Sequence, residues 1–194
     1  MNSKFNSSDY WERRYSDGRM SGDGSYGKLA IFKAEVINNF IGEHDIISML
    51  DFGCGDGNQA SFFNCQEYIG YDVSKTAIEL CKKKFAAITT RTFTNSIKNL
   101  NPVDLTLSCE VLFHLVGLDI FMQYLQKLFE LSNRFVIIYS SNSEASSVSY
   151  HIKHRNFTLF VLKYFPKWKL IKKILNKYSE ECFSDFYIYE MQGE

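Results

Sequence analysis

Residues 46–58 form the stretch with the clearest capacity for chemistry, because they contain three glycines and the aspartates Asp51 and Asp56. An apolar run at residues 46–52 leads into a turn with Gly53, Gly55 and Gly57. An apolar run without polar alternation predicts a strand that is buried on both faces, as in a parallel sheet. Glycine adopts positive φ and has no Cβ, so the main chain of this turn can lie directly against a ligand. The pattern predicts a ligand-binding loop.

The spacing of this loop distinguishes between ligands. A dinucleotide fingerprint requires a glycine where Asn58 stands, and a phosphate loop requires a Gly-Lys-Ser/Thr ending that is absent. The remaining pattern, Asp51-x-Gly-x-Gly-x-Gly, resembles motif I of the class I S-adenosylmethionine (SAM) dependent methyltransferases. The resemblance implies that Asp51 ends the first strand and that Gly53, Cys54 and Gly55 hold the amino acid end of SAM. An ordinary glycine-rich turn is the alternative.

Asp72 ends a second predicted strand, residues 68–72, about twenty positions after the loop. A carboxylate at that place accepts hydrogen bonds from both ribose hydroxyls of an adenosine. Ser74 then predicts the cap of a helix with one apolar face, as a βαβ unit requires. The resemblance adds Val73 as a cofactor contact. A turn acid with no ligand is the alternative interpretation of Asp72.

Two later strands are expected to end at the same edge. Residues 90–94 are expected to form a short β-branched strand. The turn after it should approach the adenine, with Asn95 or Ser96 at its amino group and Ile97 at its face. Residues 103–108 form a further strand that leads into Cys109 and Glu110, where doubly wound sheets bind ligands. The segment after it resembles the Val-Leu-x-His-Leu start of a family helix, and it places His114 one helical turn from Glu110.

Two histidines are candidate bases for a hydroxyl acceptor. His114 follows the fourth strand, and His151 follows the polar loop after the fifth strand, residues 134–139. Histidine is the side chain that titrates nearest to neutral pH, which suits proton transfer. A histidine that only packs in the core is the alternative for His114.

The N-terminal arm, residues 8–18, combines aromatic residues with arginines and is followed by a glycine-rich loop at 21–27 and an amphipathic helix from about residue 28 to residue 40. A lid over a sulfonium cofactor fits this composition, because aromatic faces attract cations and closure excludes water. The resemblance assigns Trp11 and Arg14 to the cofactor and Tyr26 to the acceptor. Alternatively, Trp11 and Tyr15 only pack on the sheet.

A basic stretch follows the fifth strand. Residues 151–177 contain eight lysines and arginines and no acid. We expect most of them on a solvated face, but His154 and Arg155 to turn into the crevice and bind a phosphate or carboxylate of the acceptor. The His151-x-x-His154 spacing lacks a third metal ligand, so no metal site is predicted.

The whole chain of 194 residues predicts one α/β domain, residues 1–194. It consists of an arm and lid helix at 1–42 and a core at 45–194 with a doubly wound, mostly parallel, seven-stranded sheet that ends in an antiparallel strand. Equal numbers of basic and acidic residues, 22 each, argue against nucleic acid as a partner. The lack of a signal peptide or an 18-residue apolar run predicts a cytoplasmic protein with no membrane span. Five scattered cysteines predict reduced thiols.

The resemblance implies transfer of the methyl group of SAM, with S-adenosylhomocysteine (SAH) as the product. Small bacterial proteins of this type resemble those of surface-glycan pathways, which suggests O-methylation of a sugar or a phosphorylated precursor, and the basic stretch suggests an anionic acceptor. Three alternatives remain. The first is an enzyme that N-methylates a small amine or peptide, and the second is a non-catalytic scaffold that binds SAM. The third is a nucleic-acid methyltransferase, but this sequence lacks the Asn-Pro-Pro-Tyr motif expected for one that acts on a flipped base.

Overall fold

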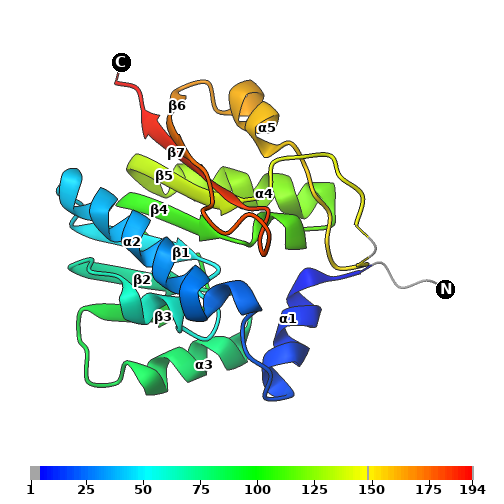
Figure 1. The fold of residues 1–194 in the computed structure, drawn as a ribbon. Coiled ribbons are helices and arrows are strands. Elements are labelled where there is room, and N and C mark those ends of the chain that lie inside the picture. Colours follow the sequence, from blue (N-terminus) through cyan, green and yellow to red (C-terminus); the bar gives the residue numbers. More distant parts are fainter. Residues whose placement is uncertain (1–4, 148, 194) are drawn as a thin grey trace.

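A seven-stranded sheet with helices on both faces forms the protein (Figure 1). The computed structural model describes residues 5–147 and 149–193. The strand order is β3-β2-β1-β4-β5-β7-β6. The strands are β1 (Ser48–Phe52), β2 (Glu67–Tyr71), β3 (Arg91–Thr94), β4 (Val103–Cys109), β5 (Ser132–Ser140), β6 (Trp168–Ile174) and β7 (Asp185–Met191). Strands β1 to β5 pair in parallel, and β7 pairs antiparallel with both β5 and β6, which confirms the predicted sheet.

Five α-helices connect or flank these strands, namely α1 (Ser7–Ser16), α2 (Gly27–Glu43), α3 (Lys75–Lys84), α4 (Leu118–Glu130) and α5 (Phe157–Tyr164). Three short 3₁₀ turns are η1 (Asp23–Ser25), η2 (Gln59–Phe62) and η3 (Leu112–His114). The predicted Ser74 cap is confirmed, since its side chain accepts from the Ala77 N–H. The connection from the glycine loop to β2 contains only the four-residue turn η2.

The sheet separates two apolar cores. On one face α2 and α3 contribute Phe32, Ile37, Phe40, Ile78 and Cys81 to the first core. On the other face α4 and α5 contribute Phe121, Leu125, Leu128, Phe157 and Val161 to the second core. The central strand β1 contributes Met49 to the first core and Leu50 to the second, and both side chains are fully buried. This double coverage explains the lack of polar alternation in its sequence.

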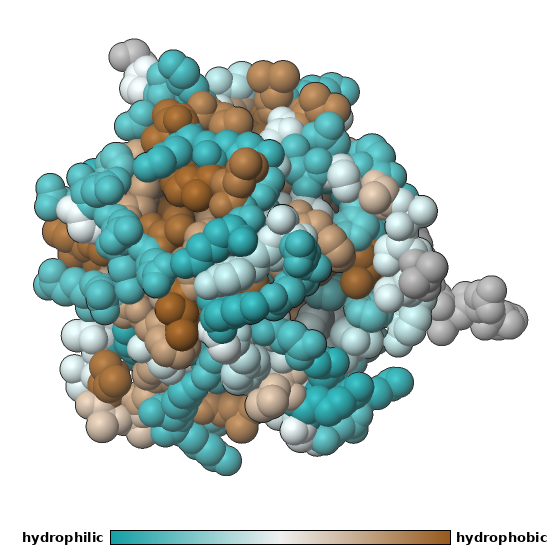
Figure 2. Space-filling view, viewed as in Figure 1, coloured by the Kyte–Doolittle hydropathy of each residue, from teal (hydrophilic) through white to brown (hydrophobic). Residues whose placement is uncertain are grey.

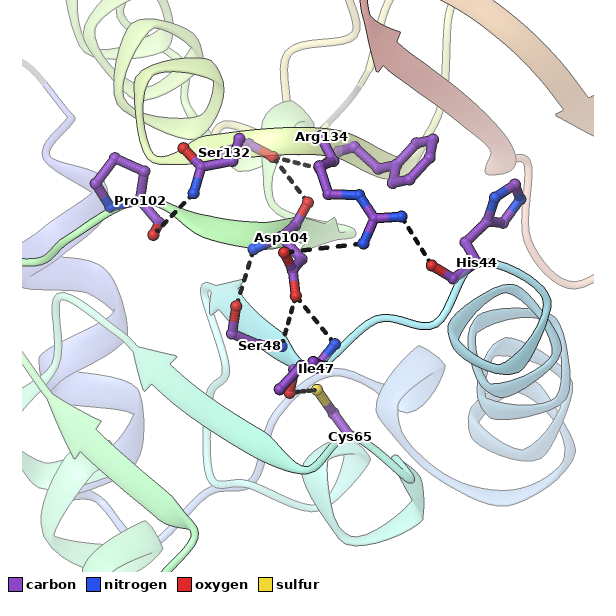
Figure 3. A network of polar contacts seen from close by, with 10 residues as sticks. His44, Ile47, Ser48, Cys65, Pro102, Asp104, Ser132 and Arg134 are labelled. Carbon is purple, nitrogen blue, oxygen red and sulfur yellow. Dashed lines mark hydrogen bonds and ion pairs between the residues drawn. The ribbon is translucent and has the colours of Figure 1, made fainter.

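A polar network joins the strands at the edge opposite the carboxyl ends of β1 and β4 (Figure 3). The Asp104 carboxylate accepts from the backbone N–H groups of Ile47 and Ser48 at 3.0 and 3.1 Å, and the Ser48 hydroxyl accepts from the Asp104 N–H. The Arg134 guanidinium lies 3.9 Å from Asp104 and donates to the His44 carbonyl. These contacts fix the relative register of β1, β4 and β5 from below the site.

Hydrophilic residues cover most of the face seen in Figure 2, and apolar atoms gather at its top, over α5 and β6. Leu159 and Leu162 on α5 and Leu170 on β6 are exposed there. Lys163 on α5 and Lys169 and Lys172 on β6 are also exposed, as predicted for the solvated part of the basic stretch. No helix within the described residues is long and apolar enough to span a bilayer.

Candidate functional site

A cavity of about 650 Å³ opens at the carboxyl ends of β1, β2 and β4. Its other walls are α1, the 21–25 segment and the turn after β4. Most of the predicted site residues line it, namely Trp11, Asp51, Gly53, Cys54, Gly55, Asp72, Val73, Ile97, Cys109, Glu110 and His114. The parallel strands place these residues together because their carboxyl ends share one edge of the sheet.

The glycine loop has the backbone that its sequence requires. Gly53, Gly55 and Gly57 have φ angles of +103°, +56° and +73°, which side-chain-bearing residues rarely adopt. A Cβ on Gly55 would lie 2.8 Å from the Tyr15 hydroxyl oxygen of α1. The N-terminal arm therefore lies directly over the loop.

Asp72 lies immediately after β2 and is 7% exposed. Its two carboxylate oxygens accept one backbone N–H each, from Gly55 at 3.0 Å and from Ser74 at 2.9 Å. Burial raises the pKa of Asp72 to about 6, although these hydrogen bonds oppose the shift. A carboxylate has about four acceptor positions, so each oxygen retains capacity for a further donor.

Asp51 forms the floor of the cavity at the end of β1 and is 3% exposed. Tyr68 donates its hydroxyl proton to Asp51 at 2.8 Å. Burial raises the pKa of Asp51 to about 6, while Tyr68 and the charge of Lys33 counteract this effect. Burial also raises the pKa of the neighbouring Cys54 thiol, which keeps it protonated.

Two predicted arm residues hold the wall of the cavity and do not line it. Tyr26 donates to the Asp56 carboxylate at 2.5 Å, and the same oxygen accepts from the Ser21 N–H. The Arg14 guanidinium donates to the Met20 carbonyl and lies 5.6 Å from the Trp11 ring centre. Both polar groups are engaged within the arm and its loop, and direct ligand contact of Tyr26 and Arg14 stays a prediction.

Glu12 is an anchor of the arm that the sequence did not reveal. Its carboxylate accepts from the Ser74 hydroxyl at 2.7 Å and the Thr76 hydroxyl at 2.6 Å. Both hydrogen bonds lower the pKa of Glu12, and the one from Thr76 has the larger effect. The arm is thereby fixed to the N-terminus of α3, next to Asp72.

His114 ends η3 and lines the cavity. Its Nδ1 lies 3.3 Å from the His151 carbonyl oxygen, which only accepts hydrogen bonds, so Nδ1 carries the proton. Burial lowers the pKa of His114 to about 4, so the ring is neutral at pH 7. The Nε2 atom is then a free acceptor, the form that a base requires.

His151 lies behind His114 and does not line the cavity. Its ring stacks on Tyr10 at 4.9 Å and on His114 at 5.6 Å between ring centres. Its Nδ1 atom is buried without a hydrogen-bond partner among the described residues. Of the two predicted bases, the geometry favours His114. His151 instead packs between Tyr10 of α1 and the turn that contains His114.

Neither His154 nor Arg155 lines the cavity, so their contact with the acceptor stays a prediction that this geometry does not support. Arg155 donates to the carbonyls of Leu115 and Val116 at 2.8 and 2.5 Å, and so holds the His114 turn in place. The His154 ring bonds to the Ser141 hydroxyl at 2.7 Å. Both side chains are buried, at 9% and 8% exposure, and their polar groups are used internally.

Ser96 is exposed and does not line the cavity, and its N–H donates to the Thr94 hydroxyl, so its contact with the adenine stays a prediction. Conversely, Lys33 and Phe113 line the cavity without having been predicted. Lys33 falls at a core position of α2, where periodicity alone predicts an apolar residue. Within the described residues, no cluster of three His, Cys, Asp or Glu side chains could hold a metal ion.

The family model of a methyltransferase domain matches residues 49–134. Comparison with curated protein sequences gave no significant match. Among solved structures, the chain resembles the N-methyltransferase NodS of Bradyrhizobium japonicum WM9 in complex with SAH, with a TM-score of 0.76, 12% identity and coverage of 97% of this chain and 100% of that one.

Two further structures are similar. Magnesium protoporphyrin IX methyltransferase from Synechocystis PCC 6803 with bound SAH gives a TM-score of 0.71 at 13% identity, covering 95% of this chain and 97% of that one. The methyltransferase domain of bacterial CtHen1 gives 0.66 at 16% identity, covering 83% and 97%. The match to the methyltransferase-domain model over residues 49–134 supports the prediction of a class I SAM-dependent methyltransferase, and the shared fold confirms the predicted sheet.

Proposed function

We propose that this class I methyltransferase domain transfers the methyl group of SAM to a hydroxyl group of a small, neutral, polar acceptor. The observation that carries the proposal is one cavity that joins the Asp72 carboxylate, the glycine loop and the free Nε2 acceptor of His114. The first two features suit a nucleoside with an amino acid end, and the third suits a hydroxyl.

In this proposal the ribose hydroxyls donate to the two open positions of the Asp72 carboxylate. Val73 and Ile97 flank the adenine, and the amino acid end runs over residues 53–55. The protein then aligns the acceptor oxygen behind the methyl carbon, and the oxygen loses its proton to His114 as the C–O bond forms and the C–S bond breaks. SAM supplies an activated methyl group, and SAH leaves.

The walls around His114 support a neutral acceptor. The residues that line the cavity include Asn6, Ser7, Ser8, Trp11, Phe113, His114, Leu115 and Ile152. The Trp11 and Phe113 rings lie against His114, at 5.0 and 4.6 Å between ring centres. Aromatic and apolar side chains with a few hydroxyl and amide groups suit a ring with both C–H and O–H surfaces, such as a sugar. With Arg155 and His154 turned away, the anionic acceptor loses its basis in these described residues, and a sugar hydroxyl remains our acceptor class.

N-methylation of a small amine is the second candidate. A pKa of about 4 makes His114 a weak base, and an amine that arrives neutral needs less help with its proton than a hydroxyl does. The N-methyltransferase NodS shares the fold but, at 12% identity, does not decide the acceptor.

The test is SAH formation from SAM with a panel of neutral sugars, phosphorylated sugars and amines. His114→Gln should lower kcat by about 10²-fold or more for a hydroxyl acceptor and leave SAH affinity unchanged. His44→Gln, at the C-terminal end of α2 against Phe40 and Phe135, is the matched control.

The pH dependence of the reaction gives a second test. Because the neutral His114 ring is the active form, kcat should stay constant from neutral pH down to about pH 5 and fall toward pH 4. Full activity of His114→Gln with a sugar would refute the base, and turnover of amines alone would favour the second candidate.

A further inference from the structure

A buried ion pair contributes to the wall of the cavity. The Lys33 ammonium of α2 lies 2.8 Å from the Glu110 carboxylate, and their side chains are 1% and 18% exposed. Both residues line the cavity. Glu110 follows β4 directly and has a φ of +58°, a backbone conformation that costs energy in a residue with a side chain. The pair is thus held in a strained turn at the ligand edge.

The Glu110 carboxylate is only partly used by the protein. One oxygen accepts from Lys33, and the other accepts from the Cys182 thiol at 3.2 Å. A carboxylate has about four acceptor positions, so about two remain. Gly24 packs directly against the carboxylate, where a Cβ would clash with it. The glycine-rich wall and the ion pair therefore fix the direction in which Glu110 offers these positions.

Lys33 is a buried cation that lies against Glu110. Burial alone would lower the pKa of Lys33, but the neighbouring Glu110 and Cys109 raise it overall, so the ammonium persists at pH 7. The same ammonium lies 5.3 Å from the Tyr139 ring centre. Removing one partner of such a pair would leave an uncompensated buried charge, so each side chain holds the other in place.

The charges of this part of the cavity match those of the cofactor. Asp51, Asp72 and Glu110 supply three carboxylates, and Lys33 supplies one enclosed ammonium. SAM carries two cationic groups, the sulfonium and the α-ammonium, and one carboxylate. With the ribose on Asp72, the amino acid end extends over the glycine loop toward Asp51 and Glu110. Complementary charge at that end favours orientation of the ligand.

We propose that Glu110 accepts hydrogen bonds from the α-ammonium group of SAM and SAH, and that Lys33 is the positioning residue that holds the Glu110 carboxylate. This inference rests on the proposed function, because it requires an adenosyl amino acid in the cavity.

The experiment compares SAH with 5′-methylthioadenosine, which has the nucleoside and sulfur but no amino acid end, by calorimetry. Glu110→Gln should weaken the binding of SAH by roughly 10- to 100-fold, which corresponds to the loss of a hydrogen bond to a charged group. The affinity for methylthioadenosine should change by less than twofold. The double variant Lys33→Met/Glu110→Gln leaves no buried charge unpaired and should show the same selective loss. Glu79→Gln/Lys82→Met, an exposed pair at 2.9 Å on α3, is the matched control.

The role of Lys33 has its own readout. In Lys33→Met the Glu110 carboxylate loses the ammonium that holds it, so its direction toward the ligand is no longer fixed. The ratio of SAH affinity to methylthioadenosine affinity should then be lower in the variant than in the wild type. Any effect on the nucleoside site cancels in this ratio, because both ligands share that site.

The outcomes separate the two proposals. If the wild type binds neither ligand, the proposed cofactor is wrong. If it binds both and the Glu110→Gln and double variants weaken them equally or not at all, the cofactor stands and the role of Glu110 is overturned. If the ratio of SAH affinity to methylthioadenosine affinity is the same in Lys33→Met and in the wild type, Lys33 does not position the carboxylate.

Discussion

Asp72 is the residue on which nucleoside binding depends most directly. Its two free acceptor positions are expected to receive the ribose hydroxyls, so Asp72→Ala should weaken SAH binding by about 1.5–3 kcal/mol. Calorimetry with SAH measures this loss. Because the Gly55 and Ser74 N–H groups also lose their acceptor, the variant should unfold at a lower temperature as well.

A ligand change separates these two effects without altering the protein. The wild type should bind the 2′-deoxyribose analogue of SAH roughly tenfold more weakly than SAH, about one hydrogen bond to a charged group. Equal affinity for both ligands would show that Asp72 supports only the loop, and the assignment of the ribose site would then be wrong.

At the scale of elements, the glycine-rich wall is joined to the ligand loop through Asp56. Tyr26 and the Ser21 N–H both donate to the same Asp56 oxygen, while the Asn58 side chain donates to the Ser25 carbonyl. Tyr26→Phe removes one of these donors and leaves the ring. We expect SAH affinity to fall by a factor of about 3–10, because the wall must be ordered at extra cost when the ligand binds.

Limited trypsin digestion tests this expectation, since Arg19 is exposed within the segment. Cleavage after Arg19 should be faster in Tyr26→Phe than in the wild type, and SAH should slow it in both. Tyr164→Phe, on the exposed part of α5, is the control. Unchanged cleavage and unchanged affinity would mean that the hydrogen bond does not hold the wall.

At the scale of the whole molecule, Asp104 stabilises the sheet at the edge away from the cavity. Burial alone would raise its pKa, but hydrogen bonds from Ser48 and Ile47 and the charge of Arg134 lower it overall. A carboxyl whose pKa is lower in the folded protein than in the unfolded chain stabilises the fold at pH values above its unfolded pKa, which is near 3.8 for an aspartate. This contribution is lost as the pH falls through the folded pKa.

Asp104→Asn should therefore lower the free energy of unfolding by about 1.5–3 kcal/mol at pH 7. The difference from the wild type should shrink as the pH falls below 4, and SAH affinity at pH 7 should not change. Denaturant unfolding at several pH values measures this. A difference that stays constant with pH would show that the charge of Asp104 does not contribute.

The sequence predicted the features that short stretches of chain control. Positive φ at three glycines is a local requirement, and continuous apolar strands follow from burial on both sides, so the Asp51–Gly57 loop and the position of Asp72 were predictable. The order of strands and helices then indicated the doubly wound sheet. The cytoplasmic location and the division into an arm at 1–42 and a core at 45–194 stay predictions.

The destinations of long polar side chains were decided only by the tertiary structure. Lys33 and Glu110 are 77 residues apart, and Arg155 lies 40 residues from the Leu115 carbonyl that it binds. The composition of the basic stretch suggested that Arg155 would bind an anionic acceptor, and it gave no role to Lys33. In the folded chain Arg155 instead binds backbone carbonyls, whereas Lys33 lines the cavity beside Glu110. A buried cation must find an acceptor, and only the folded chain determines whether the nearest one is a carbonyl of a neighbouring turn or a carboxylate at the edge of the ligand cavity.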